Sequence, residues 1–588
     1  MKAVLAAVNA KYIHSNLAVY CLGAYARMRG EQAEFKEYTI NQNPEEILKD
    51  LYLAKPDFLA LSCYIWNISM VREIAAELHK LLPEMPIWVG GPEVSYDAEH
   101  FLRENPWASG VMRGDGEITF TELLGRIREN RDLYGLPGIT WRGKDGEAIA
   151  NEDRPVMDLS EVPFPYTELT DFEHRIIYYE SSRGCPFSCS YCLSSIDKKL
   201  RFRDLSLVFR ELQFFLDHRV PQVKFVDRTF NCRHDHAKAI WRYLLEHDNG
   251  VTNFHFEVAA DLLDEEELEL IAAMRPGLIQ LEIGVQSTNG QTITEIHRKM
   301  DFAGVSAVVN RVKQGHNVHQ HLDLIAGLPF EDLESFKQSF NDVFALQPDQ
   351  LQLGFLKVLK GSFMYRMADT YGCVYRDKEP YEVLFTRWLP NCDVLRLKRV
   401  EEMVEVYYNS AQFTCTLPAC MTVFEDAFSF FDSLGSFYEK KGYFSVAHTR
   451  IRRYEILQEF MAEYVGEEDM AKYREWMVFD LYLRENMKTR PSWAADLSGW
   501  KSAFRDFYQK EEESREYLPE LAGRESRQLA KMTHLEVFSH IFEKETAVLF
   551  CYETRDPLSH SARWQKVEKI GKNCSEQSGS FDHEIVKT

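Results

Sequence analysis

Three cysteines are the residues whose type and spacing imply chemistry most directly. They lie at positions 185, 189 and 192, in the segment ESSRGCPFSCSYCLSS. Structural zinc takes four ligands, usually as two separated pairs, so a zinc site would need a further donor such as Cys232 or His234. A 4Fe–4S cluster held by three thiolates leaves one iron open to a substrate or cofactor. The spacing favours the iron–sulfur interpretation over zinc, and both over an incidental group of buried thiols.

Bulk composition restricts the setting of these thiols. Asn9, Lys11 and His14 interrupt the first apolar run before a signal-peptide core could form, and no stretch approaches the roughly 18 to 20 apolar residues that span a bilayer. We therefore expect a cytoplasmic protein with no membrane span and reduced cysteines, which disfavours a disulfide. The net charge of −22 argues against broad binding to nucleic acid.

The residues around the cysteines favour one class of iron–sulfur protein. Tyr191 precedes the third cysteine, and the resulting CPFSCSYC resembles the Cys-x3-Cys-x-aromatic-Cys loop of radical S-adenosylmethionine (SAM) enzymes. The resemblance implies a 4Fe–4S cluster on Cys185, Cys189 and Cys192, whose open iron binds the amino and carboxylate groups of SAM. An external reductant of the flavodoxin or ferredoxin type would supply the electron that cleaves SAM to methionine and a 5′-deoxyadenosyl radical.

The elements that must position this loop begin at residue 176. Six strand-like segments, IIYYESS, VKFVD, NFHFEV, LIQLEIGV, VHQHLDLIAGL and LQLGFLKVL, alternate with helical ones. This pattern predicts an open, partial (β/α)6 barrel over residues 173–370, with its chemistry at the carboxyl ends of the strands. The cysteine loop directly follows the first of these strands, where such a barrel would place it.

Several barrel segments resemble radical SAM motifs in the expected order, namely KKLRFRDLS, VKFVDRTFN, FHFEVAADLL, LEIGVQS and DLIAGLPF. The resemblance implies that the following residues contact SAM: Tyr191, Arg203, Asp227, Glu257, Glu282 and Gln286. Three of them have ordinary structural alternatives. Asp227 could cap the next segment, Glu257 could pair with an arginine inside the barrel, and Gln286 could bond to buried backbone.

Residues 1–135 show an earlier alternation of five strands and their helices, which predicts a doubly wound, Rossmann-like parallel sheet. Such a sheet binds its ligand outside the carboxyl ends of its strands. In this sequence those ends carry Asn9, Ser62, Gly90-Gly91-Pro92 and Arg113-Gly114-Asp115-Gly116.

A Rossmann-like domain directly before a radical SAM barrel resembles the cobalamin-binding arrangement, and RGDGEITFTELL resembles that family's RGEGE segment. The resemblance implies that the following residues contact cobalamin: Asn9, His14, Ser62, Gly90, Gly91, Pro92 and Gly114. The Asp-x-His-x-x-Gly signature is absent, so we expect water or no protein ligand below the cobalt, with His14 the less favoured ligand. A plain nucleotide site lacks GxGxxG after the first strand. A relic domain that binds no corrinoid is the remaining alternative.

The rest of the chain carries weaker signals. Residues 136–172, rich in proline, predict a linker, residues 371–575 a mostly helical domain with an aromatic core, and residues 576–588 a polar tail. The helical part resembles the uncharacterised C-terminal domain of one subgroup of cobalamin-dependent radical SAM proteins. Cys415 and Cys420 are interpreted as buried thiols rather than as an auxiliary cluster.

Together these features predict an α/β protein that acts as a cobalamin-dependent radical SAM enzyme on a small-molecule or peptide substrate. Methyl transfer to an unactivated carbon or a phosphinate-type centre is the favoured reaction. The alternatives are an oxidoreductase or a rearrangement or cyclisation enzyme without methyl transfer, and a corrinoid or cluster sensor without turnover.

Overall fold

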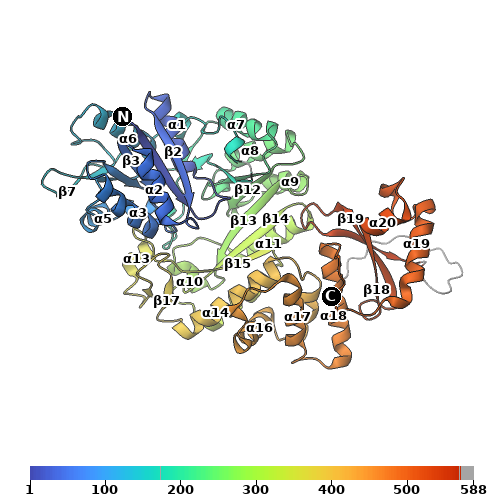
Figure 1. The fold of residues 1–588 in the computed structure, drawn as a ribbon. Coiled ribbons are helices and arrows are strands. Elements are labelled where there is room, and N and C mark those ends of the chain that lie inside the picture. The colour runs from blue at the N-terminus through green and yellow to red at the C-terminus, as the bar shows by residue number, and fades with distance from the viewer. Residues whose placement is uncertain (173, 569, 571–588) are drawn as a thin grey trace. The chain divides into compact units, whose positions relative to one another are not determined.

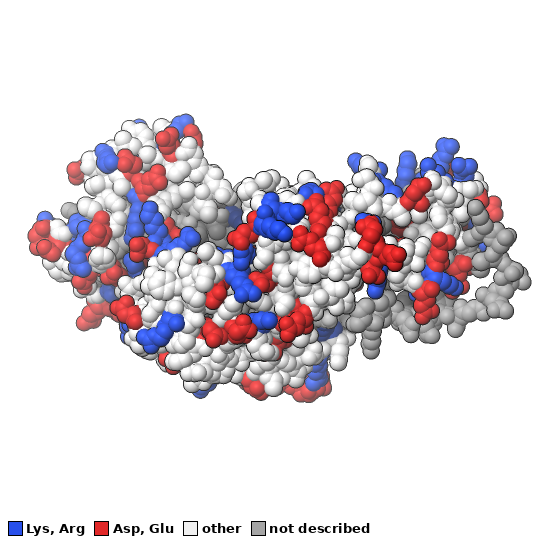
Figure 2. Space-filling model, turned by 90° about the horizontal axis from the view of Figure 1, so that it is seen from below, with Lys and Arg blue, Asp and Glu red and all other residues white. Residues whose placement is uncertain are grey.

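The computed structural model describes residues 1–172, 174–568 and 570, and the predicted polar tail lies outside them (Figure 1). The chain divides into two compact units, Met1–Ser339 with Leu353–Val394 and Phe340–Gln352 with Leu395–Thr588. On the face drawn in Figure 2, acidic and basic side chains are interspersed, in keeping with the acidic composition. No helix in the described part of the chain is long and apolar enough to cross a membrane.

The first sheet confirms the predicted Rossmann-like domain (Figure 1). Its five parallel strands, in the order β2-β1-β3-β4-β5, are β1 (Ala3–Asn9), β2 (Ala33–Thr39), β3 (Phe58–Ser62), β4 (Ile87–Gly90) and β5 (Gly110–Met112). The helices are α1 (Leu17–Met28), α2 (Pro44–Ala54), α3 (Ile68–Leu81), α4 (Pro92–Ser95), α5 (Ala98–Glu104) and α6 (Gly116–Arg128).

Strand β1 is buried throughout because helices cover both faces of the sheet. Val4, Ala6 and Val8 belong to one apolar cluster and Ala3 and Leu5 to another, as the two-residue period of a strand requires. Two cores are thus separated by the sheet, and its carboxyl edge is left to bind a ligand.

The predicted linker is wrong in its first part. Strands β6 (Ile139–Arg142) and β7 (Ala148–Ala150) extend the first sheet beyond residue 135, each pairing antiparallel with its neighbour. The turn between them contains Gly146 at φ +86°, a conformation that glycine adopts readily, so this segment closes a hairpin. The crossing to the barrel therefore begins after residue 150.

The second sheet confirms the six predicted barrel strands, in the order β15-β14-β13-β12-β11-β8. They are β8 (Ile177–Tyr179), β11 (Gln222–Phe225), β12 (Asn253–Val258), β13 (Ile279–Gln286), β14 (His319–Ala326) and β15 (Gln350–Phe355). The intervening helices include α7 (Leu205–Asp217), α8 (His234–Glu246), α9 (Glu265–Ala273), α10 (Gly290–Glu295), α11 (Phe302–Gln314) and α12 (Leu333–Phe344). A short hairpin, β9 (Ser182–Arg183) with β10 (Arg201–Phe202), brackets the cysteine loop.

The second unit is mostly helical, as predicted, but it ends in a three-stranded antiparallel sheet. Its main helices are α16 (Ala427–Lys441), α17 (Arg450–Met461), α18 (Glu467–Arg484) and α19 (Lys501–Ser514). The sheet contains β18 (Thr533–Phe538), β19 (Thr546–Arg555) and β20 (Ala562–Val567). The apolar run TAVLFCY of β19 is longer than the apolar runs of β18 and β20. Cys420 is fully buried and Cys415 half-buried, and burial raises the pKa of both thiols.

Candidate functional site

The three motif cysteines are free thiols on a loop that the backbone holds in place. Cys185 and Cys189 are buried, Cys192 is half-buried, and burial raises the pKa of the Cys185 thiol. The Cys185 N–H donates to the Asp197 carbonyl at 3.1 Å. The Ser190 N–H donates to the Ile296 carbonyl, and the Ser190 carbonyl accepts from Met364 N–H, both at 2.8 Å. The loop is therefore tied to three separate parts of the barrel.

Arg298 places a permanent positive charge beside this loop. Its Nη1 lies 3.8 Å from Cys189 Sγ, and its Nη2 donates to the Gly284 carbonyl on β13. Burial raises the pKa of the neighbouring Tyr191 hydroxyl, while Arg298 opposes that rise. Three free thiols and one guanidinium fit an anionic three-thiolate cluster better than a neutral apolar core. Sequence analysis missed Arg298, although a basic residue soon after the LEIGVQS strand was the available signal.

Glu257 lines a cavity at the carboxyl ends of the barrel strands, and Gln286 ends the neighbouring strand β13. The Glu257 side chain lines a large cavity, and burial raises its pKa to about 7, with Arg228 3.9 Å away opposing the shift. Gln286 ends β13 at φ +73°, and its buried Oε1 has no hydrogen-bond partner. An unsatisfied buried amide oxygen in a strained residue is typical of a position that a ligand completes.

Glu282 lies deeper in the barrel and is already paired. Its Oε2 is 2.9 Å from both Lys224 Nζ and His255 Nε2. Burial alone would raise the pKa of Glu282, but His255 and Lys224 hold it well below its ordinary value. Glu282 therefore links strand β13 to Lys224 on β11 and His255 on β12. Its predicted contact with SAM stays a prediction.

Asp227 and Arg203 are buried and hydrogen-bonded within the protein, and their predicted contacts with SAM stay predictions. Asp227 accepts hydrogen bonds from Ser181 N–H, Ser181 Oγ and Ser182 Oγ at 2.5 to 3.0 Å, and burial raises its pKa to about 6. Arg203 donates through Nε and Nη2 to Glu211 and through Nη1 to two carbonyls of the linker. Both residues support the strand and hairpin that carry the cysteine loop.

A cavity of about 1110 Å³ lies between the carboxyl ends of the two sheets of the first unit. It is lined by every residue that sequence analysis assigned to cobalamin: Asn9, His14, Ser62, Gly90, Gly91, Pro92 and Gly114. The barrel contributes Tyr178, Lys224 and Glu257 to its wall. The volume exceeds the roughly 300 to 1,000 Å³ of common small-molecule pockets, as a ring system with a nucleotide tail requires.

The glycine loop of this cavity fits a ligand that approaches the backbone closely. Gly91 has φ +116°, and a Cβ atom there would lie 2.4 Å from the Cys63 carbonyl oxygen. Gly114 has φ +71°, and a Cβ there would meet only open space. Tyr64 and Trp66 stack at 4.4 Å between ring centroids and also line the cavity, which gives it a flat aromatic surface. The residues present therefore fit cobalamin.

His14 is committed to a neighbour through one ring nitrogen. Its Nδ1 lies 2.7 Å from the Tyr178 hydroxyl of the barrel. Burial lowers the pKa of His14, with smaller contributions from Lys11 and Lys224. His14 therefore bridges the two domains, and its predicted role toward the cobalt stays a prediction.

Comparison with known proteins assigns all three parts of the chain. Residues 3–124 match the B12 binding domain, residues 179–343 the Radical SAM superfamily, and residues 369–550 a protein family of unknown function, DUF4080. The chain belongs to the cobalamin-dependent radical SAM family. Within that family it is of the kind that carries the C-terminal DUF4080 domain, as the sequence predicted.

The similar curated proteins are distant. The chain is 26% identical over 311 residues to the cobalamin-dependent radical SAM methyltransferase TokK of Streptomyces tokunonensis, covering 50% of this chain and 45% of TokK. It is 22% identical over 329 residues to the anaerobic magnesium-protoporphyrin IX monomethyl ester cyclase of Rubrivivax gelatinosus, covering 53% and 58%. The matches thus span about half the length of these relatives.

Two solved structures share the fold. OxsB, a cobalamin-dependent SAM radical enzyme solved with aqua-cobalamin and SAM, has a TM-score of 0.58 and 16% identity over 82% of this chain and 79% of OxsB. The methyltransferase TsrM from Kitasatospora setae has a TM-score of 0.55 and 18% identity over 65% of this chain and 82% of TsrM.

Proposed function

We propose that the protein is a cobalamin-dependent radical SAM methyltransferase that acts on an unactivated carbon of a small-molecule or peptide substrate. The observation that carries the proposal is the shared cavity. Its walls are the carboxyl ends of both sheets, and Arg183, Ile196 and Asp197, which flank the cysteine loop, form part of the lining. When bound, the cluster supplies the electron that cleaves SAM to a 5′-deoxyadenosyl radical, and cobalamin carries the methyl group.

The protein's own residues bind and orient these groups. Cys185, Cys189 and Cys192 provide three ligands and leave one iron free, while Arg298 offers positive charge to the anionic cluster and to the carboxylate of SAM. Glu257 offers negative charge to the cationic end of SAM, and Gln286 offers an amide oxygen to a hydroxyl.

The titration of Glu257 gives a pH dependence. Its pKa of about 7 means that the side chain is mostly neutral at pH 6 and mostly ionised at pH 7.5. SAM carries a permanent positive charge at its sulfonium over this range. We therefore expect anaerobic equilibrium dialysis to show SAM binding that tightens roughly five- to tenfold from pH 6 to pH 7.5.

Glu257→Gln should bind SAM more weakly and show no such tightening. Glu331→Gln is the matched control, because burial also raises the pKa of Glu331 to about 7, yet its carboxylate accepts from Ser287 and Ser339. The control should keep the pH dependence. A Glu257→Gln variant that keeps it as well would remove Glu257 from the SAM site.

Methyl transfer itself can be tested with SAM that carries a deuterated methyl group. Reconstituted, reduced protein should convert a metabolite or peptide of a cell extract into a product heavier by the labelled methyl. S-adenosylhomocysteine and 5′-deoxyadenosine should form in equal amounts. Formation of 5′-deoxyadenosine without S-adenosylhomocysteine would instead support the oxidoreductase or rearrangement alternative, and formation of neither would support a sensor.

A further inference from the structure

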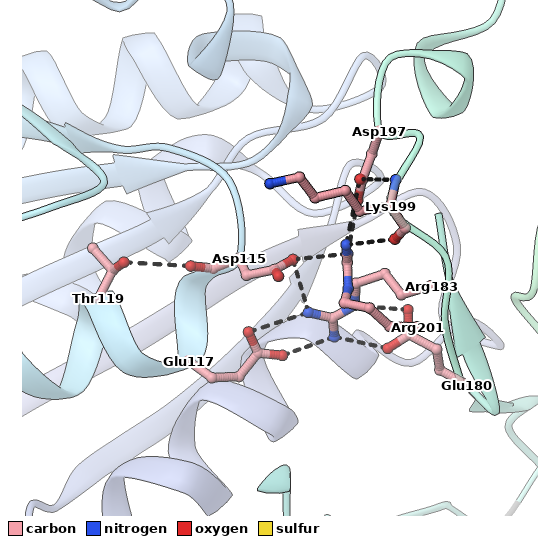
Figure 3. Close-up of polar contacts among 8 residues, drawn as sticks. All are labelled: Asp115, Glu117, Thr119, Glu180, Arg183, Asp197, Lys199 and Arg201. Atoms are coloured by element: carbon pink, nitrogen blue, oxygen red, sulfur yellow. Dashed lines mark hydrogen bonds and ion pairs between the residues drawn. The ribbon is translucent and has the colours of Figure 1, made fainter. Parts of the chain in front are cut away.

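A partly buried ion-pair cluster joins the cysteine loop to the cobalamin-side wall (Figure 3). We name it the Arg183 cluster, and its members are Asp115, Glu117, Glu180, Arg183, Asp197 and Arg201. None of these residues was assigned to a cofactor above. Asp115 and Glu117 lie at the start of α6, and the other four residues lie at the two ends of the cysteine loop. All six belong to the first unit.

Arg183 lies two residues before the first cysteine and uses all three of its side-chain nitrogens. It donates to Glu180 through Nε at 3.0 Å and through Nη2 at 2.7 Å. Nη2 also donates to Glu117 Oε1 at 2.8 Å, and Nη1 to Asp115 Oδ1 at 3.0 Å. One guanidinium thus binds three carboxylates, an arrangement that only the planar fork of arginine can make.

Arg201 forms the second half of the cluster. It lies directly opposite Arg183 on the β9–β10 hairpin, so two like charges face each other across the strands and need anions to offset them. Asp115 Oδ1 lies 3.5 Å from Arg201 Nη2, and Arg201 also holds Asp197 through Nη1 at 3.3 Å and Nη2 at 2.7 Å. Asp197 in turn accepts the Cys185 N–H through its backbone carbonyl.

These contacts therefore connect helix α6 to Cys185, the first of the three cysteines predicted to bind the iron–sulfur cluster. Gly184 lets the two arms of the hairpin meet, because it has φ +94° and a Cβ there would lie 2.8 Å from the Lys199 carbonyl oxygen. Asp115 occupies the N-cap position of α6, where an aspartate normally accepts from the helix backbone, but its side chain makes no such bond. Its carboxylate serves the arginines of the other domain instead.

Glu117 is only 4% exposed, so solvent screens its attraction to the arginines of the Arg183 cluster very little. Burial alone would raise the pKa of Glu117, but the Arg183 guanidinium holds it below its ordinary value. A buried pair of this kind costs much to break, since one partner is then left buried and uncompensated. Such contacts add little net stability but fix geometry well.

We propose that Arg183, Glu117 and Asp115 are positioning residues that set the distance and orientation of the cysteine loop relative to the cobalamin-side wall of the cavity. The functional consequence rests on the proposed function, because only a methyl transfer between the two sites needs that geometry. The structural consequence stands without it. Loss of the Arg183 cluster should make residues 115–119 and 183–201 more mobile together, while the cores of both sheets stay intact.

The first test uses the full chain without cofactors. Hydrogen exchange measured by mass spectrometry should become about tenfold faster at residues 115–119 and 183–201 in Arg183→Lys and in Glu117→Gln, and change little elsewhere. The double variant should exchange no faster than the more affected single variant, because both substitutions break the same contact. Unchanged exchange in these segments, or an equal increase over the whole first unit, would overturn the proposal.

Asp248→Asn is the matched control. Asp248 pairs with Arg275 Nε at 2.7 Å, is half-buried like Asp115, and does not line the cavity. Its loss should accelerate exchange only near residues 248–252 and 275. A control that loosens residues 183–201 as much as Glu117→Gln does would show that these segments respond to any lost ion pair.

The second test uses protein loaded with the iron–sulfur cluster and cobalamin. The spins of the reduced cluster and of cob(II)alamin should couple in the electron paramagnetic resonance spectrum, and Glu117→Gln should change that coupling while each isolated signal stays as in the wild type. An unchanged coupling would contradict the positioning role. A wild type that binds no cobalamin would contradict the proposed function instead, and the exchange experiment would still decide the structural claim.

Discussion

Replacing Cys185 with alanine is expected to abolish reductive cleavage of SAM. With one thiolate removed, two irons of the 4Fe–4S cluster would lack a protein ligand. The amount of bound iron should therefore fall from about four atoms per chain to a small remainder. Cys185 is also the ligand whose backbone is tied to Asp197, which leaves little freedom for another group to replace it. Iron content, the broad absorbance near 400 nm and 5′-deoxyadenosine formation measure the effect together.

Cys232→Ala is the control for this prediction. Cys232 is a half-buried free thiol outside the motif, and Cys185 is among the groups that raise its pKa, which burial brings to about 11. A three-thiolate cluster predicts that Cys232→Ala keeps iron, absorbance and SAM cleavage. Loss of metal in both variants, with about one zinc per wild-type chain, would favour the four-ligand zinc site instead.

Replacing Gly91 with alanine is expected to have the second largest effect, a loss of cobalamin affinity of tenfold or more. The Cβ atom would enter both a backbone conformation at φ +116° and the space 2.4 Å from the Cys63 carbonyl oxygen. Backbone cannot move aside as a side-chain end can, so the Gly90–Pro92 loop must shift. Titration with hydroxocobalamin, followed by absorbance, measures the affinity, and circular dichroism checks that the sheet has formed.

Gly146→Ala separates the clash from the strain of a positive φ. Gly146 has φ +86° in the β6–β7 turn, and a Cβ there would meet nothing within 4 Å. The control should lose about 1 kcal/mol of unfolding free energy and keep its cobalamin affinity. Equal affinities in the Gly91→Ala variant and the wild type would show that this loop does not cradle the corrinoid.

Much of the fold was predictable because it follows from the periodicity of apolar residues and from the order of strands and helices along the chain. All six barrel strands appear where alternating apolar segments indicated, and residues 1–135 form the expected doubly wound sheet. The β6–β7 hairpin was missed because glycine, aspartate and proline are common to linkers and turns. The strands beside β19 were missed because their neighbours in space, rather than their own composition, stabilise them.

The residues that line the cavity were predictable, whereas the burial of individual side chains was not. All the residues assigned to cobalamin line one cavity, because strand ends of a parallel sheet converge. Asp227 and Arg203 carry suitable chemistry at suitable positions, yet Ser181, Ser182 and Glu211 consume their hydrogen bonds. Arg183 was missed because ion pairs between distant segments leave no period or spacing in a sequence.

We infer that the cysteine loop holds an iron–sulfur cluster that cleaves SAM beside the cavity. The release of 5′-deoxyadenosine, when anaerobically reconstituted, reduced protein is mixed with SAM, tests this inference most directly. We expect 5′-deoxyadenosine together with about four irons per chain in the wild type. Protein that carries the iron, binds SAM and still releases no 5′-deoxyadenosine would contradict it.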